Sequence, residues 1–298
     1  MPDLVILGNL LVDDVVLPDP PPGRARIGQA GGATLFAALS AALWGLRPGL
    51  VSFRGEDYPR DVLQALDARG VDLAGVRTLE GITLRAWILY EGTRRRIVHR
   101  LDGPTHDEAL PRLEHLPPAW RAARAFLVAP MPFEVQAHLV AALRASLPGL
   151  IALDPYLPLG DATLAQWRGV LSEVDILFLG EDELEAPGED EAHVVERLAG
   201  GRLSLLFLKR GARGGVAVAL PEGRRHRWTG RALEVVDPTG AGDAFAAGTL
   251  AGLLRGDPME TAVLRGVVSA SFAVEDWGCA GLLRATPAAA AERLRQWS

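Results

Sequence analysis

The stretch Val235–Gly248, VVDPTGAGDAFAAG, places two aspartates and two glycines ahead of a run of very small residues. If Val235–Val236 end a strand and a helix runs on from Ala244, DPTGAG is the turn between them. The first amides of a helix have no intrahelical partners and carry the positive end of the helix dipole. Because Gly240 and Gly242 have no side chains to block an anion, the stretch predicts a phosphate cradle.

Asp243 follows the cradle directly and falls within the first turn of the predicted helix. A carboxylate beside a phosphate site is electrostatically unfavourable unless it acts there. Accepting the proton of an attacking hydroxyl is such a role. The alternative is a glycine-rich strand-to-helix turn in which Asp243 only interacts with the helix dipole.

Short apolar runs alternate with helical patterns along the chain, which predicts an α/β fold with a mostly parallel sheet covered on both faces. The expected strands are 4–8, 50–53, 124–129, 150–154, 174–180 and 203–209, and the expected helices are 31–45, 58–70, 132–147, 161–172, 190–200, 241–255, 258–276 and 287–297.

Two segments break this alternation. Residues 10–27 are strand-like and proline-rich, and residues 80–101 alternate in polarity around the hairpin signature EGTRR. We expect the two to pair as a small β-sheet lid over one end of the main sheet, within one domain spanning 1–298.

Composition and charge exclude several classes of protein. A net charge of −6 over 298 residues argues against nucleic acid or a membrane surface as the main partner. The single cysteine, Cys279, excludes an internal disulfide and fits a reducing cytoplasm. We expect no signal peptide, and the apolar stretch 28–46 is interpreted as a buried helix rather than a membrane span. The six histidines lack metal-ligand spacing, which excludes a structural zinc site.

The turn and its surroundings resemble the C-terminal signature of the ribokinase-like (PfkB) carbohydrate kinases, and the resemblance covers nearly the whole chain. It implies a three-layer ribokinase-like sandwich and an ATP-dependent kinase. Asp243 would be the catalytic base, and the amides of Gly240, Ala241 and Gly242 would form the anion hole. The matching residues are Asp237, Thr239, Gly240, Ala241, Gly242, Asp243 and Phe245.

Other segments resemble the family's binding sites. GNLLVDD (8–14) is similar to the first strand, whose aspartate, here Asp13, holds substrate hydroxyls, and Gly31–Gly32 resembles the glycine pair at the sugar site. LFLKRGARGG (206–215) resembles the segment that approaches the nucleotide phosphates. The implied nucleotide-binding residues are Lys209, Gly211, Thr239, Gly240 and Gly242.

The resemblance also implies metal ions. Glu183, in GEDE, would order water around Mg²⁺. Asp237 and Thr239 would supply oxygen ligands to a monovalent cation such as K⁺, beside the segment 269–283.

Three departures from the family pattern bear on specificity. Phe36 replaces the asparagine that grips a sugar hydroxyl, which makes the expected pocket less polar and brings cyclitols and nucleosides into consideration as acceptors. Gly180 replaces the asparagine of the N-x-x-E motif, so that Glu181 and Asp182 are candidates to complete the magnesium network. Lys209 either reaches a phosphate as a point charge or is a surface residue.

The lid hairpin is rich in arginine, and one of these side chains is a candidate to bind an acidic group on the acceptor. The alternative is that they keep an exposed sheet edge soluble. Trp87 and Tyr90 form either an apolar underside of the lid or a face for homodimerisation, because lids pair between subunits in this family. The arginines are Arg85, Arg94, Arg95, Arg96 and Arg100. Strict alternation predicts Arg94, Arg96 and Arg100 on one face of the hairpin and Arg95 on the other.

The sequence therefore predicts a Mg-ATP-dependent kinase of a small polyhydroxylated acceptor. One alternative is a non-catalytic nucleotide or metabolite sensor on the same scaffold, which the missing asparagines favour and the intact Gly240–Asp243 core opposes. A dehydrogenase of the Rossmann type is disfavoured because the first strand is not followed by a glycine-rich fingerprint.

Overall fold

The computed structural model describes residues 1–298 apart from 19–23, 92–93, 157–158, 161, 185–187 and 189. Within the described residues the larger sheet has nine strands in the order β13-β12-β11-β10-β9-β8-β1-β4-β5. The seven strands from β11 to β5 in this spatial order are parallel to one another. Strands β12 and β13 add an antiparallel edge next to β11. The strands are β1 (Leu4–Leu7), β4 (Pro48–Arg54), β5 (Asp72–Thr78), β8 (Ala125–Val128), β9 (Leu150–Leu153), β10 (Ile176–Gly180), β11 (Leu205–Lys209), β12 (Gly215–Ala219) and β13 (Arg224–Trp228).

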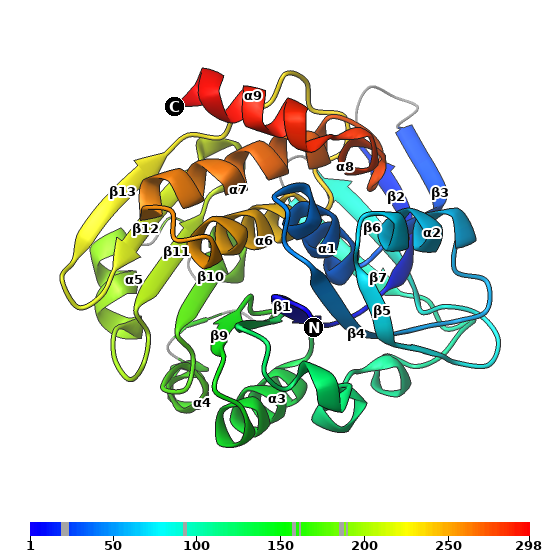
Figure 1. Ribbon diagram of the computed structural model, residues 1–298, viewed down its shortest axis with the longest axis horizontal. Coiled ribbons are helices and arrows are strands. Elements are labelled where there is room, and N and C mark those ends of the chain that lie inside the picture. Colours follow the sequence, from blue (N-terminus) through cyan, green and yellow to red (C-terminus); the bar gives the residue numbers. More distant parts are fainter. Residues whose placement is uncertain (19–23, 92–93, 157–158, 161, 185–187, 189) are drawn as a thin grey trace.

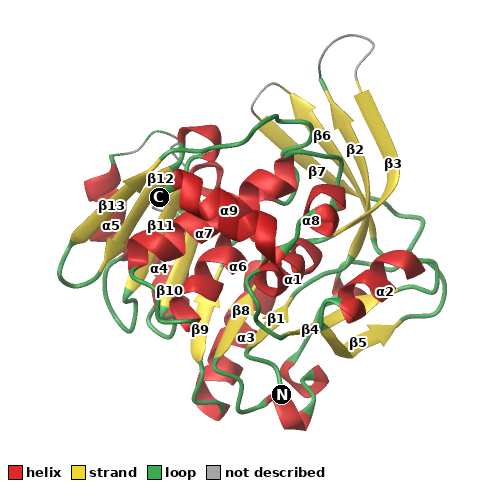
Figure 2. Ribbon diagram, turned by 45° about the horizontal axis from the view of Figure 1, so that its top comes forward, coloured by secondary structure: helices red, strands yellow, loops and turns green. Residues whose placement is uncertain are grey.

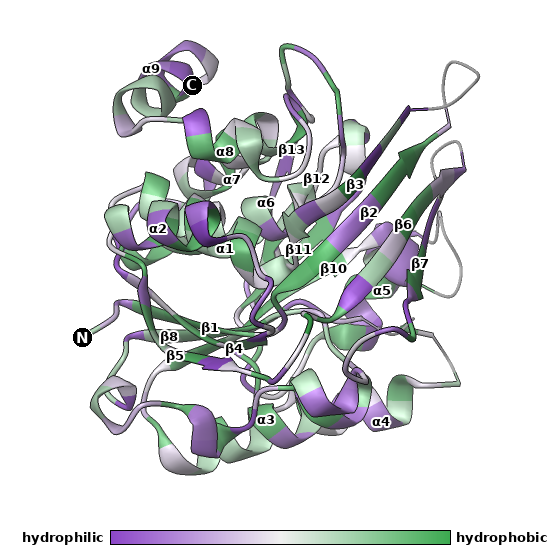
Figure 3. Ribbon diagram, turned by 90° about the vertical axis from the view of Figure 1, so that its right-hand side faces the viewer, coloured by the Kyte–Doolittle hydropathy of each residue, from purple (hydrophilic) through white to green (hydrophobic). Residues whose placement is uncertain are grey.

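Helices cover both faces of this sheet, as Figures 1 and 3 show. Successive strand residues point to opposite faces, so in β1 Ile6 packs into one apolar core and Leu7 into the other. This arrangement confirms the predicted three-layer α/β sandwich. The helices of the first face are α1 (Ala33–Leu43), α2 (Arg60–Ala68), α6 (Ala241–Leu254), α7 (Met259–Val274), α8 (Ala280–Arg284) and α9 (Pro287–Trp297); those of the second are α3 (Phe133–Ser146), α4 (Leu164–Leu171) and α5 (Glu191–Leu198). Single 3₁₀ turns occur at Asp107–Ala109, Leu113–His115, Pro118–Trp120, Glu181–Glu183 and Gly211–Arg213.

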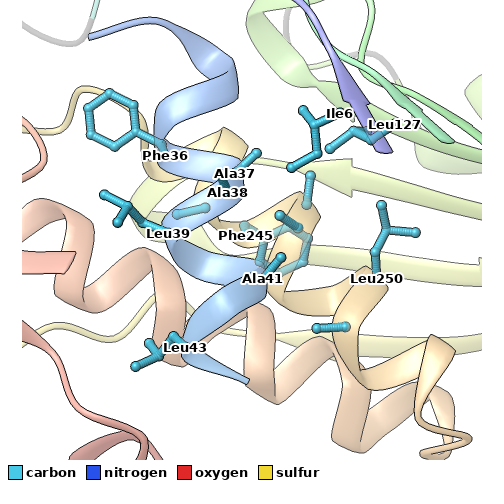
Figure 4. Packing of buried hydrophobic residues seen from close by; sticks show 14 of the residues in the cluster. Ile6, Phe36, Ala37, Ala38, Leu39, Ala41, Leu43, Leu127, Phe245 and Leu250 are labelled. Carbon is cyan, nitrogen blue, oxygen red and sulfur yellow. The ribbon is translucent and has the colours of Figure 1, made fainter. Parts of the chain in front are cut away.

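The small residues of α6 let helices approach one another closely. A Cβ built on Gly248 would overlap the Ser269 hydroxyl and lie 3.0 Å from the Arg265 carbonyl oxygen of α7. On the other side, the Ser40 hydroxyl of α1 donates to the Ala244 carbonyl at 2.7 Å. The close packing of α1 on α6 is visible in Figure 4. The small-residue run thus fixes the position of the helix that carries Asp243.

The four-stranded lid sheet has the order β3-β2-β6-β7, and it projects from the main body in Figure 2. Its strands are β2 (Leu11–Leu17), β3 (Arg24–Gly31), β6 (Arg85–Glu91) and β7 (Arg94–His99). The predicted pairing of the two segments is confirmed, with β2 and β6 parallel and the other pairs antiparallel. The proline-rich 19–23 and the hairpin pivot 92–93 lie outside the described residues. That the chain forms one domain with an inserted lid stays a prediction.

Alternation along β6 sends Trp87 and Tyr90 to opposite faces of the lid. Trp87 lies on the outer face, under the Arg100 guanidinium. Tyr90 packs on the inner face against the apolar cluster of Val15, Leu17 and Ile88. Only Tyr90 can therefore belong to an apolar underside of the lid, and only Trp87 to an outer face for homodimerisation.

The sequence-based prediction was wrong for Val235–Val236, which do not end a strand. The Val236 amide donates to the Val274 carbonyl at 2.8 Å, at the end of α7, rather than to a neighbouring strand. Strands β5 and β13 were missed because they are largely exposed and lack an apolar run. The buried strand β12 and the short α8 were missed as well. No helix among the described residues is long and apolar enough to cross a membrane.

Two glycine-to-alanine substitutions test the close helix packing. Alanine is favoured over glycine inside a helix by about 1 kcal/mol. Gly248→Ala should nevertheless lower the free energy of unfolding by about 1–3 kcal/mol, because the added methyl group has no room against α7. Gly169→Ala in α4, where nothing lies within 4 Å, should raise it. Urea denaturation measures both, and stabilisation by both substitutions would show that α6 and α7 are not in close contact.

Candidate functional site

The carboxyl ends of three parallel strands bring charged side chains to one edge of the sheet. Asp154 follows β9, Lys209 ends β11, and the turn containing Glu183 follows β10. The register pairs Gly180 with Lys209. Ligands of open parallel sheets bind at this edge, and the N-terminus of α6 meets it here.

Lys209 and Asp154 form a buried ion pair at this edge. The Lys209 ammonium donates to both Asp154 carboxylate oxygens at 2.8 and 2.7 Å, and Asp154 is only 2% exposed. Burial disfavours the ammonium, but Asp154 and Glu183 outweigh it and raise the pKa of Lys209. The interpretation of Lys209 as a surface residue is therefore wrong. Its Nζ lies 3.5 Å from the position of a Cβ on Gly242, next to the predicted cradle.

Asp154 was missed in the sequence. Its position in the sequence could have identified it. An aspartate directly after the buried strand LIAL lies at the edge of a parallel sheet where ligands bind. Gly211, the other residue expected on this segment, lies in the exposed turn after Lys209 with φ +55° and open space around it.

The fully buried Asp237 side chain fixes the turn before α6 through hydrogen bonds. One of its carboxylate oxygens accepts from the Thr239 amide at 2.9 Å and the other from the Gly278 amide at 3.0 Å. The carboxylate thereby ties this turn to the loop before α8. A role for Asp237 and Thr239 in binding a monovalent cation stays a prediction.

Helix α6 begins at Ala241, with Gly240 in the left-handed conformation at φ 76°. The Ala241 amide makes a long bond of 3.4 Å to the Pro238 carbonyl. In the part of the chain that the structure describes, the amides of Gly240 and Gly242 donate to no protein acceptor. Two of the three expected anion-hole amides are therefore open.

Asp243 lies half-buried in the first turn of α6. Burial and the nearby Asp154 raise its pKa to about 6, while Lys209 and Arg95 oppose the shift. A carboxylate with this pKa is mostly ionised at neutral pH and is a stronger base than an exposed aspartate.

Phe36 is a packing residue and is only 1% exposed. A side chain on Gly240 would overlap its ring, so the ring fills the space beneath the turn. Figure 4 shows Phe36 at the start of α1, within the apolar cluster that α1 shares with α6. The expectation that Phe36 lines the acceptor pocket is thus corrected by its burial.

Asp13 and the glycine pair form a second polar centre. A Cβ on Gly31 would overlap the Asp13 carboxylate, and the Gly32 amide donates to that carboxylate. Asp13 is 3% exposed, and its Oδ1 atom has no partner among the described residues. Burial raises the pKa of Asp13 to about 7; the Gly32 amide opposes the shift, and the charge of Asp237 adds to it.

Glu183 lies half-buried beside this charged edge. Its Oε2 atom accepts from the Gly180 amide at 2.6 Å, and burial raises its pKa to about 8 against the opposing charge of Lys209. Glu181 is paired with Arg210 and Arg213, so it is not available for the predicted magnesium network. Asp182 is exposed and points toward the lid.

The carboxylates of this edge fit a magnesium ion held through water. Mg²⁺ prefers oxygen ligands, retains several waters and binds through one or two carboxylates together with substrate phosphates. No group of three metal-ligating side chains is assembled among the described residues. Glu183, with Asp182 nearby, is thus a suitable partner for a hydrated ion rather than part of a protein cage.

Arg95 brings a cation to the site from the lid. It pairs with Tyr90 across β6 and β7, and the Tyr90 hydroxyl lies 3.0 Å from the Thr239 hydroxyl in the turn before α6. Its guanidinium lies 4.0 Å from the Asp182 carboxylate, and the Arg95 side chain is 38% exposed. The other described arginines of the segment 80–101 point elsewhere: Arg85 to Asp57, Arg100 to Asp14 and Arg96 to the outer face.

Comparison with known proteins assigns the family. Residues 19–285 match the model of the pfkB family carbohydrate kinases. The chain belongs to this pfkB family. It is 32% identical over 292 residues to a cytidine kinase of Thermococcus kodakarensis, covering 93% of this chain and 98% of that protein.

Solved structures with the pfkB kinase fold superpose over almost the whole chain. A putative ribokinase II of E. coli in complex with ATP and Mg²⁺ has a TM-score of 0.75 at 20% identity, covering 99% of this chain and all of that one. The nucleoside kinase of Methanocaldococcus jannaschii has a TM-score of 0.71 at 21% identity, covering 99% and 98%. The protein is accordingly an ATP-binding phosphotransferase with an alcohol group as acceptor.

Substitutions of the ion pair test its role in charge balance. Lys209→Met should lower the free energy of unfolding at pH 7 by about 3–5 kcal/mol, because it leaves the Asp154 charge buried and unpaired. The loss should shrink as the pH falls, since protonation removes that charge. The double variant Lys209→Met/Asp154→Asn should recover most of the stability. Urea denaturation measures all three proteins, and additive losses in the double variant would contradict the pairing.

Proposed function

We propose that this pfkB protein transfers the γ-phosphoryl group of ATP to a hydroxyl of a small polyhydroxylated acceptor, with Asp243 as the base. The observation that carries the proposal is the juxtaposition of two unpaired amides, at Gly240 and Gly242, with a carboxylate whose pKa is raised to about 6. The amides stabilise charge on the transferred group, and Asp243 takes the proton of the attacking hydroxyl.

Two cations on opposite sides complete the charge arrangement. Lys209, fixed by Asp154 next to Gly242, faces the cradle from the sheet, and Arg95 faces it from the lid. Phosphoryl transfer depends mostly on positioning and on cations around the phosphoryl oxygens. Bound Mg²⁺ would supply further positive charge to the phosphates, and Glu183 would hold it through water.

The acceptor lies at Asp13 in this proposal. The unpaired Oδ1 atom of Asp13 accepts from an acceptor hydroxyl, while Gly31 and Gly32 allow close approach to the backbone. Sugars, cyclitols and nucleosides all carry suitable hydroxyl groups. A nucleoside is the candidate favoured by the 32% identity to a cytidine kinase over nearly the full length of both proteins.

The alternative function, a nucleotide or metabolite sensor without catalysis, is less well supported. The open amides beside a base argue against it, because a sensor has no use for Asp243. We also propose that the protein works in a reducing cytoplasm and forms a homodimer through the outer face of the lid, where Trp87 and Val98 are partly exposed.

Substitution of Asp243 tests the base assignment. Asp243→Asn should reduce kcat by about 10²–10⁴-fold, because general base catalysis contributes that much. ATP affinity, measured by calorimetry, should change little, since the open amides are retained. In the wild-type enzyme, kcat/KM should rise with pH around pH 6 as Asp243 loses its proton. Near-normal turnover in the variant would refute the role of Asp243.

Alanine substitutions of the neighbouring Arg95 and Arg96 test whether Arg95 acts specifically at the site. Arg95→Ala should lower kcat by about 100-fold, a loss typical of one removed transition-state donor. Arg96→Ala is the matched control, because it removes the same charge from the opposite face of β7. Steady-state rates of phosphoryl transfer are compared for the two variants. If both substitutions lower kcat equally, Arg95 acts only through the overall surface charge and not as a specific cation at the site.

A further inference from the structure

A cluster of three neutral polar side chains lies where the lid joins the main sheet. The Asn9 amide nitrogen is 3.0 Å from the His106 Nε2 atom, and the rings of His99 and His106 are 4.7 Å apart, tilted by 43°. Asn9 is 5% exposed. Among the described residues, neither Asn9 Oδ1 nor His99 Nδ1 has a hydrogen-bond partner, although both atoms are buried.

This cluster adjoins the proposed acceptor site on two sides. Across the lid, Asp13 pairs with Ala86, and Ala86 pairs with His99. Residues paired side by side point to the same face of a sheet, so Asp13 and His99 flank the short Ala86 side chain on the inner face. Asn9 lies against the glycine pair, because a side chain on Gly32 would overlap the Asn9 carbonyl. The cluster therefore lies beside the proposed acceptor site.

Both imidazoles are neutral at physiological pH. Burial lowers the pKa of His99, and burial together with His99 lowers the pKa of His106 to about 4, although Asp107 opposes that shift. With His106 Nε2 accepting from the Asn9 amide, Asn9 Oδ1 has a free lone pair for an N–H or O–H donor. A buried acceptor left without a partner is costly, which favours a ligand that supplies the missing donor.

We infer that Asn9, His99 and His106 form a subsite for the base of a nucleoside acceptor, with Asn9 Oδ1 accepting from a base N–H group. Each of the two half-buried imidazole rings offers an aromatic face of the kind on which bases stack. An amide side chain reads the hydrogen-bonding edge of a base. This inference rests on the proposed function for the position of the acceptor at Asp13 and for the phosphorylation of the bound nucleoside.

Calorimetry with the intact protein tests the subsite directly, and it uses cytidine and N4,N4-dimethylcytidine as probes. The dimethylated analogue cannot donate from its exocyclic nitrogen. Cytidine should bind about 10- to 100-fold more tightly than the analogue, the factor expected for an unsatisfied buried acceptor. Asn9→Leu should abolish this preference, and His99→Ala should weaken both ligands while preserving it. Neither change should alter the KM for ATP.

His138→Gln is the matched control, because it removes an exposed imidazole on α3 that bonds only locally to Glu134. It should leave both affinities within twofold, and thermal unfolding confirms that each variant is folded. Equal affinity of the wild-type protein for the two probes, or an unchanged preference in Asn9→Leu, would overturn the inference while the kinase proposal stands. Selective cytidine binding without any phosphoryl transfer would uphold the subsite and refute the kinase proposal.

Discussion

The ion pair between Lys209 and Asp154 is the interaction on which the candidate site depends. Parallel strands necessarily deliver their carboxyl ends to one edge, and here that edge collects Asp154, Asp182 and Glu183 next to Asp243. Without a compensating cation these acidic groups would repel one another and any phosphate. Lys209 lies at the centre of the group, within reach of the amides of α6. The same cation thus compensates the buried Asp154 charge and prepares the edge to receive an anion.

The turn before α6 shows how the apolar core positions a polar site. Its underside is filled by the Phe36 ring, its start is tied down by Asp237, and its helix is drawn against α1 and α7 by small residues. These contacts leave only the outer surface of the turn free. Because the backbone is fixed from three directions, the open amides of Gly240 and Gly242 need little reorganisation to meet a charge, which is the condition for strong electrostatic stabilisation.

Local patterns predicted much of this structure. Continuous apolar runs identified the buried strands, alternating polarity identified the lid, and DPTGAGD identified the turn. Features that depend on distant partners were not predictable. Asp154 gains its importance from a lysine 55 residues away. Alternation separated Arg95 from its neighbours in the sequence, but only the strand register assigned it to the inner face of the lid. Phe36 was expected in the pocket, and its burial depends on how α1 packs against a helix some 200 residues later in the chain.

The two ends of the proposed active site differ in charge, and this difference bears on the choice of acceptor. The phosphate end contains ionised groups that compensate one another, with Lys209 and Arg95 set against the carboxylates. Around Asn9 the available groups are an amide and two neutral imidazoles. A cation is needed to bind an anionic acceptor at that end, since burying an unpaired charge is far more costly than burying a neutral polar group. Because Arg100 and Arg85 are held in ion pairs with Asp14 and Asp57, the part of the site around Asn9 favours an uncharged acceptor. A nucleoside meets this condition and a sugar phosphate does not.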